Sequence, residues 1–206
     1  MLYPRKTPLR KGEALVSDEQ GVGLTEHMGN CHRILFLSGT ITGEMELHNL
    51  LMTLDSFSHD PIRIIITSTG GDLDSTFLLY DTIKLIKSPV ETLGRFCASA
   101  AAIVLAAGSK RYLLPNCRTM LHLPSGMMAG DSRDFDIQHK QMESYRNKMA
   151  DILIECGVKK TREEILTDID RDFWLDADEA CRYGLADEIM SKDTWQSWIK
   201  GADKNE

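Results

Sequence analysis

Ser99 is the single hydroxyl in an otherwise apolar run, residues 98–107, which Gly108 follows. The alanine and leucine content of this run predicts a helix that ends at the glycine, and its small side chains allow close approach to other backbone, so we expect it to be buried. Ser99 would then lie in the first turn, beside unpaired backbone N–H groups and the positive end of the helix dipole. This setting favours a nucleophile whose reaction develops an oxyanion. The alternative is that Ser99 only caps the helix.

A serine nucleophile needs an imidazole to take its proton and a carboxylate to fix the imidazole tautomer. His122 is the histidine expected at the end of a buried strand, although a structural, hydrogen-bonded role is the alternative there. Acidic side chains are dense further on, where Asp168, Asp170 and Asp172 alternate and would point the same way in an extended chain. A solvated charged face is the alternative for these carboxylates. Spacing alone does not show that the three groups meet.

The elements that would position these residues alternate along the chain. Buried strands are predicted at residues 33–38, 62–67 and 90–93. Apolar residues that recur every three or four positions predict one helix at 44–57 and a second that begins near Phe77 and ends before Pro89. Residues 68–71 are expected to form a turn, and short strands are predicted at 111–114 and 119–122. Strands that alternate with helices are typical of parallel βαβ units, whose helices cover the sheet.

A long helix is predicted at residues 131–155, where apolar side chains recur at helical spacing (Phe135, Met142, Tyr145, Met149 and Ile152). It would be roughly 37 Å long, more than a compact core of this size requires. We therefore expect it to project or to pack against another subunit. Capping boxes predict two short helices after it, one from Thr161 with Glu164 and one from Asp176 with Glu179.

Composition limits the class of protein. The chain has 206 residues, 42% hydrophobic and 27% charged, which suits one soluble domain. A net charge of −7 without any basic stripe argues against nucleic-acid binding. The apolar runs are too short to cross a bilayer, and no signal peptide is recognisable. Five scattered cysteines without a C-x-x-C pair indicate a reducing compartment and neither disulfides nor a metal site, so we expect a cytoplasmic protein. Cys97 is a second, weaker candidate nucleophile.

Six fragments in series resemble the Clp protease proteolytic subunit family, over roughly residues 34–190. They are Ser-Thr-Gly-Gly at 68–71, Tyr-Asp-Thr-Ile at 80–83, Cys-Ala-Ser at 97–99, the run 106–116 around Lys-Arg-Tyr-Leu-Leu-Pro-Asn, Met-Leu-His-Leu-Pro-Ser-Gly at 120–126, and residues 171–187 around Arg-Asp-Phe-Trp-Leu-Asp. The resemblance implies an α/β fold, a crotonase-like ββα spiral with a projecting handle helix. It also implies a serine endopeptidase that hydrolyses unfolded polypeptides inside a homo-oligomer of two stacked rings of seven subunits. An AAA+ unfoldase would feed the chamber and use the ATP, so that this chain would need no cofactor of its own.

The same resemblance assigns roles to individual residues. Ser99 would be the nucleophile, His122 the general base and Asp172 the orienting carboxylate. The backbone N–H groups of Gly71 and Ala100 would form the oxyanion hole. The resemblance further implies a strand that holds extended substrate, formed here by Ser125, Gly126 and Met127. It also implies an arginine that pairs across the interface between the rings, which here is Arg171.

The sequence departs from the family pattern at several positions. Thr69 replaces the usual proline, and Met127 replaces the second glycine of the substrate strand. Arg63 and Ile65 stand where the family often has aromatic residues that line the pocket for the ATPase. The extent of the resemblance divides the chain into three parts. Residues 1–31 are expected to form an N-terminal arm, 32–192 the peptidase domain, and 193–206 a C-terminal helix and tail.

Two alternative functions remain open. One is an inactive ring subunit, and the other is a crotonase-type acyl-CoA hydratase or isomerase with a carboxylate base.

Overall fold

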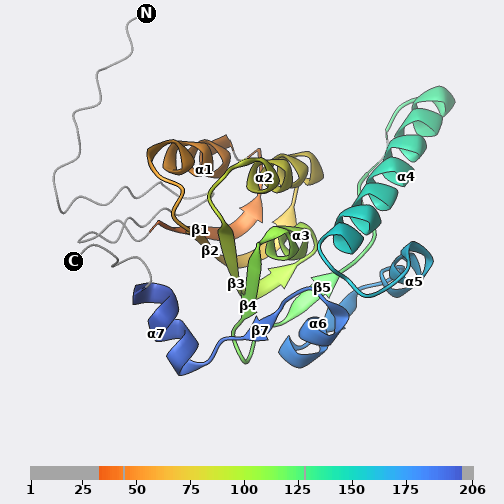
Figure 1. The fold of residues 1–206 in the computed structure, drawn as a ribbon. Coiled ribbons are helices and arrows are strands. Elements are labelled where there is room, and N and C mark those ends of the chain that lie inside the picture. Colours follow the sequence, from red (N-terminus) through yellow and green to blue (C-terminus); the bar gives the residue numbers. More distant parts are fainter. Residues whose placement is uncertain (1–32, 44, 128, 201–206) are drawn as a thin grey trace, which may run out of the picture.

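The chain folds around a twisted seven-stranded sheet, as the computed structural model shows for residues 33–43, 45–127 and 129–200 (Figure 1). The expected arm at 1–31 and the last residues, 201–206, lie outside the described residues. In chain order the elements are β1 (Ile34–Ile41), α1 (Met45–Phe57), β2 (Ile62–Gly71), α2 (Leu73–Leu85), β3 (Val90–Ala98), α3 (Ala100–Ala107), β4 (Lys110–Leu113), β5 (Thr119–Leu121), α4 (Ser132–Glu155), α5 (Arg162–Asp168), β6 (Phe173–Leu175), α6 (Ala177–Tyr183), β7 (Glu188–Ile189) and α7 (Lys192–Lys200).

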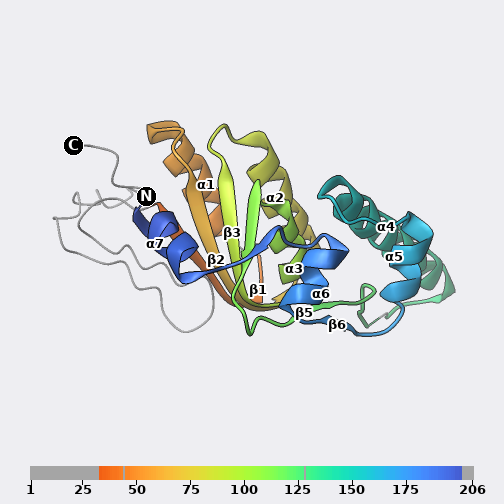
Figure 2. The ribbon, with the colours of Figure 1, turned by 60° about the horizontal axis from the view of Figure 1, so that its bottom comes forward.

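The sheet is parallel along its main path, in the order β1-β2-β3-β4-β7. The strand β5 pairs in parallel with the end of β3, at Cys97 and Ala98, and β6 then pairs antiparallel with β5. The prediction of parallel βαβ units covered by helices is therefore confirmed. One face of the sheet packs on α1, α2 and α3, and α7 lies on the other side (Figures 1 and 2). No helix in the described ranges is both long and apolar enough to cross a bilayer.

The strand β1 continues past its predicted end to Ile41, and two further strands extend beyond their predicted ends. Residues 68–71 form the end of β2 rather than a turn, because Gly70 and Gly71 pair with Thr40 and Ile41 of β1. The strand β3 continues to Ala98, where β5 supplies its pairing partners. Pairing with neighbouring strands overrides the local turn signal in both places. Ser99 is therefore the only residue between the end of β3 at Ala98 and the start of α3 at Ala100.

The extended conformation in which Asp168, Asp170 and Asp172 would point the same way is not formed. Asp168 is the last residue of α5, Ile169 is its C-cap, and the next strand begins only at Phe173. The capping box at Thr161, which was correctly predicted, starts a helix that runs into the acidic segment. The three carboxylates therefore belong to different local structures and do not share a strand face.

The long helix α4 projects from the body of the protein, as predicted (Figure 1). Its 24 residues would span about 36 Å. Its predicted apolar stripe is not continuous, however, because Met149 and Ile152 are buried in the core of this same chain, whereas Phe135 remains 44% exposed. Only the C-terminal part of α4 packs on the body, so the exposed apolar side chains of its projecting part are Phe135 and Ile137.

Candidate active site

The Oγ atom of Ser99 lies 2.6 Å from Nε2 of His122, so the two side chains share a hydrogen bond. Ser99 follows the last residue of β3, and His122 follows the last residue of β5. Because these two strands are parallel neighbours, both residues leave the sheet at the same edge. The backbone N–H of Ser99 also donates to the carbonyl of Met120, at 2.7 Å, which fixes the serine beside the histidine strand. This pair has the geometry of a nucleophile and its general base.

Ser99 adopts a backbone conformation that side chains rarely tolerate, with φ 57° and ψ −127°. These angles resemble those of the first central residue of a type II′ turn, a position dominated by glycine. Holding a serine there costs on the order of 1–3 kcal/mol. Its hydroxyl makes no capping bond to α3, so the capping alternative is wrong. A strained serine on a sharp strand-to-helix turn is the arrangement that exposes the nucleophile in α/β-hydrolases.

The end of β2 lies in close contact with this turn. A Cβ atom at Gly70 would come within 2.6 Å of the Ala98 carbonyl oxygen and 2.8 Å of the Ala100 nitrogen. Gly70 also has φ 88°, and at Gly71, where φ is 154°, a Cβ would collide with the backbone of Ile41. Only glycine fits at these two positions. The backbone at Gly70 is therefore held against the serine turn, whereas Gly71, the next residue, is held against Ile41 of β1.

Ala100, expected to provide the second N–H group of the oxyanion hole, lies at the start of a helix. It is the first residue of α3, whose opening N–H groups have no acceptor within the helix. All eight residues of α3 are buried, so the prediction of a buried helix is correct, although it begins at Ala100 rather than at Ala98. Cys97 is also fully buried, and burial raises the pKa of its thiol, which removes it as a competing nucleophile.

Asp172 directly precedes β6, as His122 directly follows β5. The antiparallel register pairs Leu121 with Phe173, so the next pair along the ladder would be His122 and Asp172. The Asp172 side chain is exposed, and in the described part of the chain it has no hydrogen bond to His122. Of the other two carboxylates, Asp168 accepts a hydrogen bond from the Tyr183 hydroxyl, at 3.0 Å, and Asp170 lies 3.4 Å from Arg171. The structure thus brings Ser99 and His122 together and leaves the carboxylate at the edge of the site.

The expected substrate strand follows His122 along the edge of the site. Ser125, Gly126 and Met127 are exposed, and a small cavity of about 130 Å³ separates Gly126 and Met127 from Met142 of α4. Arg171, expected to pair with another subunit, is exposed and donates to the Asp170 carbonyl within its own loop.

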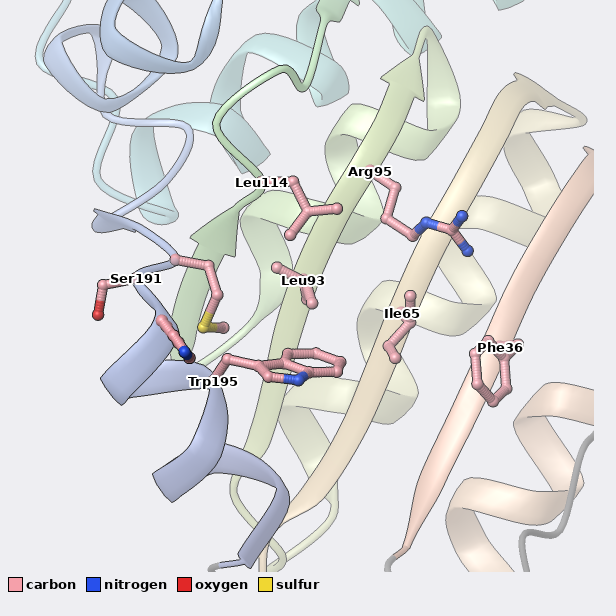
Figure 3. Close-up of a pocket in the computed structure, with 9 residues that line it drawn as sticks. Phe36, Ile65, Leu93, Arg95, Leu114, Ser191 and Trp195 are labelled. Carbon is pink, nitrogen blue, oxygen red and sulfur yellow. The ribbon is translucent and has the colours of Figure 1, made fainter.

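A larger cavity, of about 490 Å³, lies between the strands and α7, on the face of the sheet opposite α1, α2 and α3 (Figure 3). Ile65 lines it together with Phe36, Leu93 and Trp195. Arg63, the other position where the family often has an aromatic residue, does not line this cavity. Its Nε lies 3.3 Å from Glu91 and its guanidinium lies over the ring of Trp198, at 5.4 Å from the centroid.

Comparison with known proteins agrees with this architecture. A variant of ClpP1 from Listeria monocytogenes superposes with a TM-score of 0.72 at 34% identity, covering 79% of this chain and 94% of that one. The fold is therefore that of a Clp proteolytic subunit. The family model of Clp protease matches residues 20–193. The chain belongs to the Clp protease family.

Its relatives are similar over most of their length. ATP-dependent Clp protease proteolytic subunit 1 of Rhodopirellula baltica is 37% identical over 167 residues, which make up 77% of this chain and 72% of that protein. Proteolytic subunit 2 of Pseudomonas aeruginosa is 36% identical over 163 residues, covering 77% of this chain and 81% of the relative. The chloroplastic subunit 4 of Arabidopsis thaliana is 35% identical over 186 residues, covering 86% of this chain and 61% of that protein.

Proposed function

We propose that this chain is a serine endopeptidase, the proteolytic subunit of a Clp-type protease. The observation that carries the proposal is the 2.6 Å hydrogen bond between Ser99 Oγ and His122 Nε2, formed at a strained serine. Ser99 would attack the peptide carbonyl carbon while His122 accepts its proton. The N–H groups of Gly71 and Ala100 would stabilise the resulting oxyanion, and His122 would then protonate the leaving amine. Water would release the acyl group from Ser99 by the same steps. Side chains and backbone perform all of these steps, so the chain needs no cofactor for them.

The third member of the proposed triad is Asp172, which would hold the neutral imidazole with its proton on Nδ1. The β5–β6 pairing supports this role, because it sets Phe173, the residue after Asp172, opposite Leu121, the residue before His122. We propose that assembly brings its carboxylate to the histidine, because the adjacent Arg171 is exposed and would pair with a neighbouring subunit. Activity would then depend on assembly.

The two alternatives fit the site less well. A crotonase-type hydratase or isomerase would use a carboxylate base, and a hydrogen-bonded serine and histidine would have no role in its chemistry. An inactive ring subunit has no need for a serine held in a conformation that costs stability. The proposed assembly is a homo-oligomer of stacked rings, which would receive unfolded polypeptides from an AAA+ ATPase in the cytoplasm.

Labelling with a fluorophosphonate probe tests the proposed activity. The probe forms a covalent bond with an activated serine, so we expect one label per chain, located on Ser99 by peptide mass spectrometry. Ser99→Ala should take up no label, and His122→Ala should be labelled far more slowly. A wild-type protein that takes up no probe, or takes it up at another residue, would contradict the proposal.

Assembly is expected to depend on the projecting part of α4. Ile137 is 66% exposed and Phe135 44% exposed, and apolar side chains left in water at the end of a projecting helix mark an interface. We expect Phe135→Glu with Ile137→Glu to give smaller species in sedimentation velocity and to reduce peptidase activity in parallel.

The matched control for that pair is Lys140→Glu, an exposed position of the same helix that changes the net charge by the same amount. It should leave the size of the assembly unchanged, because it removes no apolar surface. Full-size particles from the Phe135 and Ile137 variant would show that α4 does not hold the assembly together.

A further inference from the structure

The two backbone donors proposed for the oxyanion hole are each attached to the start of a helix. Gly71 lies two residues before Leu73, the first residue of α2, and Ala100 is the first residue of α3. Between them, Gly70 leaves no room even for a methyl group against Ser99. Gly71 is held by its pairing with Ile41 of β1 on one side and by the first turn of α2 on the other, so a shift of that turn relative to α3 would change the distance between the two donors.

The helix α4 contacts this first turn of α2. The hydroxyl of Tyr145 lies 2.9 Å from both carboxylate oxygens of Asp74, which is three residues after Gly71. The two rings of Tyr145 and Phe77 pack with their centroids 5.9 Å apart, and the Lys148 ammonium group lies 4.4 Å from the Phe77 centroid. Tyr145 is thus half-buried on α2, at the point where α4 leaves the body of the protein.

The same helix is connected to the other side of the site through the chain itself. Residues 123–131 run from His122 to the start of α4 and include the proposed substrate strand. Asp131 begins α4 with a capping box to Asp134. A rigid α4 therefore has the substrate strand at its N-terminal end and the Asp74 contact near its middle.

We infer that Tyr145 is a positioning residue for the oxyanion hole. By donating to Asp74, it holds the first turn of α2, and with it residues 70–71, against Ser99, and so couples the orientation of α4 to the placement of the Gly71 N–H. This inference rests on the proposed peptidase function. It predicts an effect on the chemical step, because the oxyanion exists only after the serine has attacked.

The chain contains a matched contact that should have no such effect. The hydroxyl of Tyr80 donates to Glu155, at 2.8 Å, and joins the same two helices. Tyr80 lies nine residues after Gly71, just past the middle of α2 and about two helical turns beyond its first residue. Comparing Tyr145→Phe with Tyr80→Phe therefore separates a loss of positioning from a general weakening of the packing between α2 and α4.

The experiment measures kcat and KM for a short fluorogenic peptide, with sedimentation velocity and thermal unfolding on the same samples. Tyr145→Phe keeps the ring and removes the hydroxyl. We expect it to lower kcat roughly three- to tenfold, the range for one ordinary hydrogen bond, because this bond is exposed to solvent. KM and the size of the assembly should stay unchanged. Tyr80→Phe should keep the wild-type kcat and lose at least as much thermal stability. Asp74→Ala should reproduce the effect of Tyr145→Phe, and the double variant should be no slower than either single one.

Three outcomes, each measured beside an active wild type, would overturn the inference. The first is a wild-type kcat for Tyr145→Phe, and the second is a loss of kcat no larger than that of Tyr80→Phe. The third is a loss of kcat that comes with smaller assemblies. A wild-type protein that neither turns over the peptide nor reacts with fluorophosphonate would instead overturn the proposed function, and this inference with it.

Discussion

Ser99→Ala is expected to lower kcat for a fluorogenic peptide by roughly 10⁴–10⁶, because the nucleophile and its base act as one unit. The residual rate would come from the oxyanion hole and from substrate binding. Alanine removes only the oxygen that bonds to His122, so the assembly should keep its size in sedimentation velocity. A variant with wild-type turnover would exclude Ser99 as the nucleophile.

The strained backbone of Ser99 provides a second measurement that does not depend on activity. Glycine accommodates φ 57° without strain, whereas alanine carries the same penalty as serine. We expect Ser99→Gly to be equally inactive but more stable than Ser99→Ala by about 1 kcal/mol in thermal unfolding. Equal stability of the two variants would show that the turn is not strained.

Asp172→Asn is expected to lower kcat by roughly 10⁴ in the assembled protein, since an asparagine favours the wrong tautomer of the histidine. The substitution leaves the size of the side chain unchanged and should not affect the β5–β6 pairing that places it. The measurement is the peptide assay under conditions where sedimentation velocity shows a full-size particle.

The neighbouring carboxylates serve as controls for Asp172. Asp168→Asn keeps an acceptor for the Tyr183 hydroxyl, and Asp170→Asn weakens only an exposed ion pair with Arg171, so both should have mild effects. If either one slowed the reaction more than Asp172→Asn, the carboxylate would have been assigned to the wrong position.

The sequence was sufficient to predict the elements whose signals are local. The apolar run at α3, the glycine after it and the capping boxes at Thr161 and Asp176 all predicted real helices. Where partner strands decide the structure, local signals failed: the Gly70–Gly71 pair indicates a turn, yet its pairing with β1 makes it the end of a strand. The conformation of Ser99 was not predictable either, since a serine before an alanine run gives no sign of a positive φ.

Contacts between residues far apart in the chain could not be predicted from the sequence either. The spacing of apolar residues on α4 suggested a single stripe, but the fold buries Met149 inside this chain and leaves Phe135 in water. Tyr145 and Asp74 are 71 positions apart, and neither shows a local sequence signal that would connect them. The proximity of Ser99 and His122 was expected from the family resemblance, whereas their residue types and spacing left it open.

The pairing of β5 with the end of β3 has a consequence during synthesis on the ribosome. Ser99 is bonded to two residues from β5 and the position after it, through its N–H group to the Met120 carbonyl and through its hydroxyl to His122. The segment that carries Asp172 reaches this site only when β6 pairs with β5. A nascent chain that has emerged only as far as α3 carries the proposed nucleophile without its proposed base. The proposed site would therefore be completed late in translation, and a half-made chain would have no means to cut other emerging polypeptides.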